Sequence, residues 1–424
     1  MVNPAQRLAR MLDELGRVTD EPGRLTRTFL SPAMERANQL VGGWMQEAGL
    51  TVREDDTGNL IGRLEAGIPA RGRRQAAPLH AKTLLFGSHL DTVRNAGRFD
   101  GALGVLLPIV ALAELKQRGV AFPFAVEVLG FSEEEAVRFT GAYIGSKAYT
   151  GRLRAADLKL SDVRGQTLRE VIEAHTGRRF TPPKPAHRPR NLLGYVEVHI
   201  EQGPVLEAKK LAVGVVSAIA SQRRGRLIFR GRAGHAGTTP MNLRRDALTG
   251  AAEFVLFAEA FAAARAPLVV TVGTINVPSG AANVIPGETV VSLDVRHPSD
   301  AACSAALADL IRQAQRTARR RQLICEWQQT MQHEATTCSS SLTAQLARSV
   351  RAVQGKSISL MSGAGHDGVV MSTLTPIAML FVRCRDGLSH HPDEYASPRD
   401  LAVALRVMID FLECLSADYA NRRG

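Results

Sequence analysis

The sequence is poor in cysteine, in aromatic residues and in long apolar runs. It has five cysteines in 424 residues, an odd number, and no CxxC pair. Neither a disulfide-built scaffold nor a zinc-thiolate site is therefore expected, and a reducing, cytoplasmic location is. The longest nearly apolar run, Ala102 to Leu115, is shorter than the roughly 20 residues of a membrane-spanning helix. No apolar signal segment follows the N-terminus, so neither secretion nor membrane attachment is expected.

Positive charge is in excess but is not concentrated. Lysine and arginine number 53 against 41 aspartates and glutamates, which gives a formal net charge of +12. The basic residues are mostly scattered, and aromatic residues make up only 5% of the chain, so no row of stacking side chains accompanies them. We therefore expect a solvated basic surface and no nucleic-acid partner.

Apolar runs of strand length alternate with helical patterns in the first half of the chain. Strands are expected at 82–87, 124–131 and 194–200, with helices at 101–118 and from about 138. This alternation is typical of an α/β fold with a mostly parallel sheet.

A different pattern occupies the middle of the chain. A β-α-β-β-α-β order, typical of a ferredoxin-like α+β domain, is indicated by strands and helices at 224–230, 244–264, 267–277, 289–296 and 301–321. We expect an inserted domain over 213–328. The catalytic domain would then combine residues 1–212 and 329–424.

Histidines and carboxylates gather where the expected strands end. His89 follows the first strand, a run of three glutamates begins at Glu133 after the second, and His199 closes the third. In an open α/β sheet the ligand site lies beyond the carboxyl ends of the strands. Each of these residues, taken alone, is ordinary for a strand end. Together, and without thiolates, they indicate zinc, manganese or cobalt, with groups enough for two ions that share a carboxylate.

These segments resemble the carbamoylase branch of the zinc aminoacylase and carboxypeptidase superfamily. That branch includes N-carbamoyl-L-amino-acid hydrolases, β-ureidopropionase-type enzymes and allantoate amidohydrolases. HIEQGP and HAGTTPM distinguish it from the ordinary peptidases of the superfamily. The matching motifs span almost the whole chain: GSHLDTV (87–93), FDGALGVL (99–106), SEEEAVRF (132–139), VEVHIEQGPVLE (196–207), GHAGTTPM (234–241), NVIPG (283–287), DVRHPSD (294–300), SGAGHDG (362–368) and GLSHHPDE (387–394).

The resemblance implies a metallopeptidase-like catalytic domain that holds two divalent ions, Zn2+, Mn2+ or Co2+, and an inserted domain that acts as a lid and forms a homodimer. One ion would be held by His89 and His199. The other would be held by Glu135 and His390, with Asp100 bridging the two.

The resemblance also implies roles beside these ligands. Asp91 would orient His89, and Glu134 would be the general base. A register shifted by one residue, with Glu133 as base and Glu134 as ligand, is the alternative. The Arg-Phe pair that follows the triplet favours Glu134 and Glu135, although Ala-Val replaces the family's usual glycine and small residue there.

Substrate contacts follow from the same resemblance. His235 and His366 would stabilise the oxyanion, and His235 can come from the neighbouring subunit. Arg296 would hold the substrate carboxylate at two points. The remaining contacts would be Gln202, Asn283 and Gly365. For Arg223 and Arg244, structural and substrate roles stay equally open.

The implied reaction is hydrolysis of the ureido C–N bond of allantoate or an N-carbamoyl-L-amino acid, with release of carbon dioxide and ammonia. An aminoacylase or peptidase on the same fold is the alternative within the class. A relative that only binds its ligand is the alternative outside it, and the occupied ligand and base positions argue against it.

Overall fold

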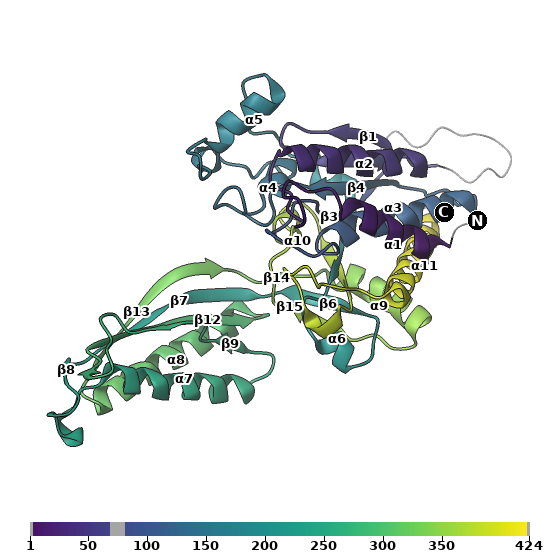
Figure 1. Ribbon diagram of the computed structural model, residues 1–424. Coiled ribbons are helices and arrows are strands. Elements are labelled where there is room, and N and C mark those ends of the chain that lie inside the picture. The colour runs from purple at the N-terminus through teal and green to yellow at the C-terminus, as the bar shows by residue number, and fades with distance from the viewer. Residues whose placement is uncertain (1–2, 68–80, 422–424) are drawn as a thin grey trace. The chain divides into compact units, whose positions relative to one another are not determined.

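The computed structural model of the chain describes residues 3–67 and 81–421 (Figure 1). These residues form two compact units. One consists of the chain up to Ser217 and from Cys338 onward, and the other of Ala218–Thr337. The second unit is a continuous insertion, for which the sequence predicts 213–328.

The first unit is built on a sheet with the strand order β1-β2-β4-β3-β5-β16-β6. Its central strands β4, β3, β5 and β16 are parallel, whereas β1, β2 and β6 pair antiparallel. The predicted α/β fold with a parallel central sheet is therefore confirmed. The strands are β1 (Thr51–Glu54), β2 (Leu60–Leu64), β3 (Thr83–His89), β4 (Ala125–Phe131), β5 (Leu192–Ile200), β6 (Val213–Ile219), β15 (Ser359–Ser362) and β16 (Ile377–Val382).

The central strands are buried along almost their whole length because helices cover them. β3 and β4 expose no residue, as expected for parallel strands made of continuous apolar runs. Helix α3 packs on β3 and β5 and is itself covered by α1, α2 and α11. The helices of this unit are α1 (Pro4–Leu15), α2 (Pro32–Ala48), α3 (Ala102–Gln117), α4 (Ile144–Tyr149), α5 (Leu168–Thr176), α6 (Val205–Ala208), α9 (Ser340–Gln354), α10 (Gly368–Met371) and α11 (Pro398–Asn421), with 3-10 turns at Asp157–Lys159, Pro189–Asn191 and Arg385–Gly387.

The helix expected from about residue 138 begins later, at Ile144, so that prediction is wrong. The cause is the side chain of Glu133, whose Oε1 accepts hydrogen bonds from the main-chain N–H groups of Arg138 (2.8 Å) and Phe139 (2.7 Å). These bonds hold the segment as a loop. The side chains of Phe139 and Ile144 then join a separate apolar cluster with Leu158.

The second unit has the predicted β-α-β-β-α-β order. Its antiparallel sheet has the order β10-β12-β7-β13, and α7 and α8 cover one face (Figure 1). The inserted α+β fold is confirmed, with a last strand that the sequence analysis did not name. The elements are β7 (Ser221–Arg230), β8 (Gly234–His235), a 3-10 turn (Met241–Leu243), α7 (Ala247–Ala263), β9 (Val269–Thr271), β10 (Ile275–Asn276), β11 (Val284–Ile285), β12 (Glu288–His297), α8 (Asp300–Arg320), β13 (Ile324–His333) and β14 (Thr336–Thr337).

Two elements of this unit have other bounds than the sequence predicts, and hydrogen bonds to nearby side chains explain both differences. Helix α7 begins at Ala247 because the Asp246 carboxylate accepts the N–H groups of Leu248 and Thr249. The expected strand 267–277 is split into β9 and β10, and the Ser292 hydroxyl accepts two N–H groups from the break between them.

Within the described ranges, none of the helices combines the length and the apolarity needed to cross a membrane. The cytoplasmic location stays a prediction.

Candidate metal centre

Three of the predicted ligands meet at the carboxyl ends of neighbouring strands. His89 ends β3, His199 lies at the end of β5, and Asp100 lies at the head of α3, which packs on both strands. The Oδ1 atom of Asp100 lies 3.0 Å from His199 Nε2 and 3.6 Å from His89 Nε2. All three side chains are at most 4% exposed.

Both imidazoles are oriented by main-chain carbonyl groups. His89 Nδ1 lies 2.9 Å from the carbonyl oxygen of Asp91, and His199 Nδ1 lies 2.9 Å from that of Ile200. A carbonyl oxygen only accepts, so each Nδ1 carries a proton and each Nε2 presents its lone pair to Asp100. Two acceptors that face each other at 3.0 Å in a buried site require a cation or a proton between them. The residues present therefore fit a metal ion.

A second group of ligands meets the other oxygen of the same carboxylate. Asp100 Oδ2 lies 3.2 Å from His390 Nε2, which is 3.6 Å from Glu135 Oε1. Among the described residues, the groups suited to a metal ion are His89–Asp100–His199, Asp100–Glu135–His390 and His89–Glu134–Glu135. Asp100 thus turns one oxygen toward each of two histidine sets.

The three consecutive glutamates point in different directions. Glu134 and Glu135 approach His89, whereas Glu133 turns away to the N–H groups of Arg138 and Phe139. Burial raises the pKa of Glu133 to about 8, and the charge of Asp91 adds to this. This geometry favours Glu134 and Glu135 over the shifted register.

Asp91 orients the glutamate loop with its side chain. Its two carboxylate oxygens accept the main-chain N–H groups of Glu134 and Glu135, each at 3.1 Å. The sequence analysis expected the carboxylate to orient His89, but it lies 3.9 Å from His89 Nδ1, and the carbonyl oxygen of Asp91 makes that contact instead.

The electrostatics of the site follow from burial and from the shared carboxylate. Burial alone would raise the pKa of Asp100, but the neighbouring imidazoles of His199, His390 and His89 hold it well below its usual value. Burial raises the pKa of Glu134 well above its usual value. The nearby His89 acts to lower this pKa, whereas the negative charge of Glu135 raises it further. Excess negative charge at this point is what a divalent cation would relieve.

Polar side chains that the sequence analysis did not single out support Asp100. Ser389 Oγ lies 3.0 Å from Asp100 Oδ2, and Glu394 Oε1 accepts the N–H groups of Phe99 (2.9 Å) and Asp100 (3.0 Å). Gln202, a predicted substrate contact, donates to Asp100 Oδ2 at 3.2 Å. Both missed residues lie in the quoted motif GLSHHPDE. Their signal was a serine and a glutamate flanking a candidate ligand.

A cavity of about 200 Å³ opens on this centre. Gly365, an expected substrate contact, lines it, and a Cβ atom there would lie 2.0 Å from the hydroxyl of Tyr143, so a larger residue would displace that ring. Tyr143 is a further lining residue that the sequence analysis missed, because it expected helix at this point. The lining consists of His89, Asp100, Glu134, Glu135, Tyr143, His199, Gln202, Ala364, Gly365 and His390.

His366 is not among the lining residues. It is 1% exposed, its Nε2 lies 2.7 Å from Ser362 Oγ, and its ring packs edge-on against His199 with the centroids 4.5 Å apart. Burial and the nearby His199 lower its pKa well below the usual value, so the ring is neutral. The structure therefore places His366 behind a candidate ligand.

The predicted substrate contacts of the second unit lie in two separate regions of that unit. His235 pairs with Val284 between β8 and β11, next to Asn283. Its Nδ1 accepts the N–H of Gly237 at 3.1 Å, which leaves a neutral ring with its proton on Nε2 as a donor. Arg296 lies near the other end of β12, and two of its nitrogens donate to Asp294 at 2.9 Å.

The arginines that were left open have structural partners. Arg223 is 4% exposed and donates to both carboxylate oxygens of Glu334 at 3.0 Å. Arg244 donates to the carbonyl oxygens of Thr239 and Ala236, so it holds the loop that carries His235.

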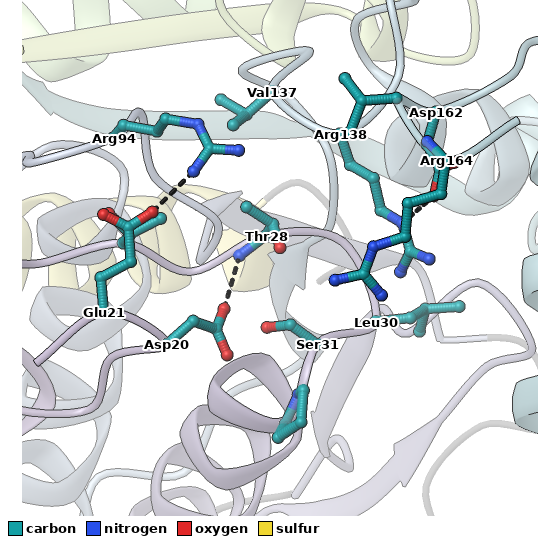
Figure 2. A pocket seen from close by; sticks show the side chains of 13 residues that line it. Asp20, Glu21, Thr28, Leu30, Ser31, Arg94, Val137, Arg138, Asp162 and Arg164 are labelled. Atoms are coloured by element: carbon teal, nitrogen blue, oxygen red, sulfur yellow. Dashed lines mark hydrogen bonds and ion pairs between the residues drawn. The ribbon is translucent and has the colours of Figure 1, made fainter. Parts of the chain in front are cut away.

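A larger cavity of about 350 Å³ lies elsewhere on the first unit (Figure 2). Four of its six charged side chains form ion pairs, since Arg94 contacts Glu21 at 2.6 Å and Arg138 contacts Asp162 at 3.2 Å. No histidine or cysteine is among its lining residues. It has none of the chemistry of the metal centre.

Comparison with known proteins identifies relatives over almost the whole chain. Residues 85–413 match the family described as Peptidase family M20/M25/M40. Allantoate deiminase 2 of Glycine max is 38% identical, covering 96% of this chain and 88% of its own length. N-carbamoyl-L-amino acid amidohydrolase of Geobacillus stearothermophilus is 36% identical, covering 95% and 96%. Among solved structures, an amidase of the hydantoinase/carbamoylase family from Burkholderia multivorans has a TM-score of 0.87 at 31% identity, covering 96% and 97%.

Proposed function

Because the chain belongs to peptidase family M20/M25/M40, we propose that it is a metal-dependent amidohydrolase that cleaves the ureido C–N bond of allantoate or of an N-carbamoyl-L-amino acid. The observation that carries this proposal is the Asp100 carboxylate, whose two oxygens face two separate groups of side chains, one with His89 and His199 and the other with His390 and Glu135. That arrangement suits two ions that share one bridging carboxylate.

The proposed ligands divide into two sites. His89 and His199 would hold one divalent ion and Glu135 and His390 the other, with Asp100 shared between the two sites. Oxygen and imidazole ligands suit Zn2+, Mn2+ or Co2+. Bound there, the ions supply Lewis acidity to the substrate carbonyl and to the attacking water.

Glu134 is the proposed general base. It lines the cavity beside His89 without belonging to either proposed ligand set, and Asp91 fixes its main chain. It takes the proton of the attacking water and returns it to the leaving nitrogen. The released carbamate then breaks down to carbon dioxide and ammonia, and the free amine stays on the other product.

The proposed substrate contacts come from both units. Gln202 and Gly365 line the metal cavity, while His235, Asn283 and Arg296 belong to the second unit. His235 offers Nε2–H to the oxyanion, and Arg296 holds the carboxylate. For His366 we propose an indirect role, in which its neutral ring supports His199.

A homodimer is part of the proposal, and distances within the second unit support it if His235 and Arg296 both contact the substrate. His235 lies beyond the start of β12, and Arg296 lies eight residues after Glu288, or about 27 Å along the strand at about 3.4 Å per residue (Figure 1). A ureido acid is about as long as two extended residues, roughly 7 Å. One substrate therefore reaches both side chains only if they come from two chains.

The test of the proposed activity is ammonia release from a panel of ureido acids. Allantoate or N-carbamoyl-L-amino acids should release ammonia, a chelator should abolish the activity, and elemental analysis should find about two divalent ions per chain. An aminoacylase or peptidase would instead cleave N-acyl amino acids or peptides without releasing ammonia from the ureido substrates. Full activity in the metal-free protein would contradict the proposal.

Replacement of Arg296 tests the carboxylate anchor. We expect Arg296→Lys to raise KM and to lower kcat/KM about tenfold, because a charge-assisted hydrogen bond contributes about 1.5–3 kcal/mol. Lysine keeps the charge but cannot bind Asp294 and a substrate carboxylate together through a planar fork.

The matched control is Arg230→Lys. Arg230 lies on β7 of the same sheet and pairs with Glu288 and Glu326, so its replacement should leave kcat/KM unchanged. A substrate amide should be poor for every variant. If Arg296→Lys discriminates acid from amide as strongly as the wild type, Arg296 is not the anchor.

A further inference from the structure

Glu394 connects the loop of the shared carboxylate to the loop of the most exposed ligand. It is 3% exposed, and its Oε1 accepts the N–H groups of Phe99 and Asp100. Its Oε2 lies 3.0 Å from Ser389 Oγ, which in turn lies 3.0 Å from Asp100 Oδ2. One side chain therefore fixes both the main chain and, through Ser389, the carboxylate of Asp100. Ser389 is also the neighbour of His390 in the chain.

The Asp100 loop is shaped around this glutamate. Helix α3 has a glycine, Gly101, as its N-cap and no side-chain cap of its own. The two residues that precede this glycine, Phe99 and Asp100, donate their N–H groups to the Glu394 carboxylate, which lies 294 residues after Asp100 in the chain. A Cβ atom on Gly97 would lie 2.3–2.5 Å from three atoms of Glu394. Such close wrapping of the backbone around one carboxylate leaves Asp100 little freedom to move.

The two metal sites depend on this contact to different degrees. His89 and His199 lie at strand ends and are oriented by carbonyl groups that do not involve Glu394. His390 lies on a loop, and its side chain is 51% exposed. Its ring contacts Asp100, Glu135 and Gln202.

We propose that Glu394 is a positioning residue that sets the affinity of the second metal site, formed by Asp100, Glu135 and His390, without touching metal or substrate. The inference rests on the two-metal centre of the proposed function. Without the Glu394 side chain, both the Asp100 carboxylate and the loop of His390 lose hydrogen-bond contacts that fix their positions. The first site keeps two histidines that are fixed independently.

The test is a titration of the metal-free protein with Mn2+ alone, followed by equilibrium dialysis and elemental analysis. The wild type should bind two ions. Glu394→Ala should bind one ion with wild-type affinity and the other about 10- to 100-fold more weakly, the usual cost of losing a group that orients a ligand. Glu135→Gln, which removes a ligand of the second site, identifies which ion remains tight.

Two further variants separate positioning from folding. Glu394→Gln keeps an oxygen for both N–H groups and gains an N–H for Ser389 Oγ, so it should restore wild-type affinity at both sites. Ser389→Ala leaves the main-chain contacts of Glu394 in place and removes the link to the carboxylate, together with the hydrogen bond that Ser389 Oγ accepts from Gln202. Ser389→Ala should also lower the affinity of the second site for Mn2+. If Glu394→Ala does not fold, this variant provides the test of the inference.

A matched control removes a carboxylate of the same kind from the other unit. Asp246 accepts two N–H groups at the start of α7. Asp246→Ala should lower Tm and leave both Mn2+ affinities unchanged. Equal weakening of both sites in Glu394→Ala, or unchanged second-site affinity in Ser389→Ala, would overturn the inference. A wild-type chain that binds fewer than two ions would overturn the proposed two-metal centre, and the inference with it.

Discussion

Glu134→Gln is expected to lower kcat by at least about a hundredfold, the usual contribution of a general acid–base group, while the chain keeps its metals. The amide has the shape of the carboxylate, and its main-chain N–H stays bound to Asp91. What it loses is the ability to take a proton. Steady-state ammonia release gives kcat, and elemental analysis of the same sample gives the metal content.

The neighbouring glutamates are the matched controls for this variant. Glu135→Gln should lose metal as well as activity, because Glu135 lies 3.6 Å from His390 in the second ligand group. Glu133→Gln should remain active, because its amide oxygen can still accept the N–H groups of Arg138 and Phe139. If Glu133→Gln is inactive with metals bound and Glu134→Gln loses metal, the register shifted by one residue is correct.

Part of the proposed ligand group could be located from the sequence, because two of its residues, His89 and His199, lie at the ends of regular strands. β3 and β5 are largely buried and mostly apolar, so their ends can be recognised in the sequence. Because the two strands are parallel, their carboxyl ends lie at the same edge of the sheet. His89 and His199 follow from that rule. Asp100 follows because α3 is apolar on all sides and packs against the same strands.

Side-chain direction was not predictable from position in the chain. Glu394 accepts the N–H group of Asp100, just before α3, across 294 residues, and nothing in the local sequence indicates which main-chain groups it binds. His366 lies in a matching motif, yet its ring points behind His199. Asp91 was expected to orient His89 through its carboxylate, but its carbonyl makes that contact and frees the side chain for the glutamate loop.

Two inactive variants are expected to restore each other's activity when they are mixed. One chain carries His235→Ala and the other Glu134→Gln. If His235 acts on the neighbouring chain's metal centre, a mixed dimer has one site with both lesions and one intact site. Random exchange at equal amounts makes half of the dimers mixed, so about a quarter of the wild-type activity should return. Ammonia release after co-refolding or co-expression measures it.

The control mixture pairs Glu134→Gln with Glu135→Gln. Both lesions lie on the first unit, so every site in a mixed dimer keeps one of them and no activity should return. Restoration only in the first mixture would mean that the oxyanion donor crosses between chains. If neither mixture recovers although mixed dimers form, His235 serves its own chain. In that case a single substrate cannot also reach Arg296, since the length of β12 separates the two side chains. The carboxylate anchor would then have to be another residue.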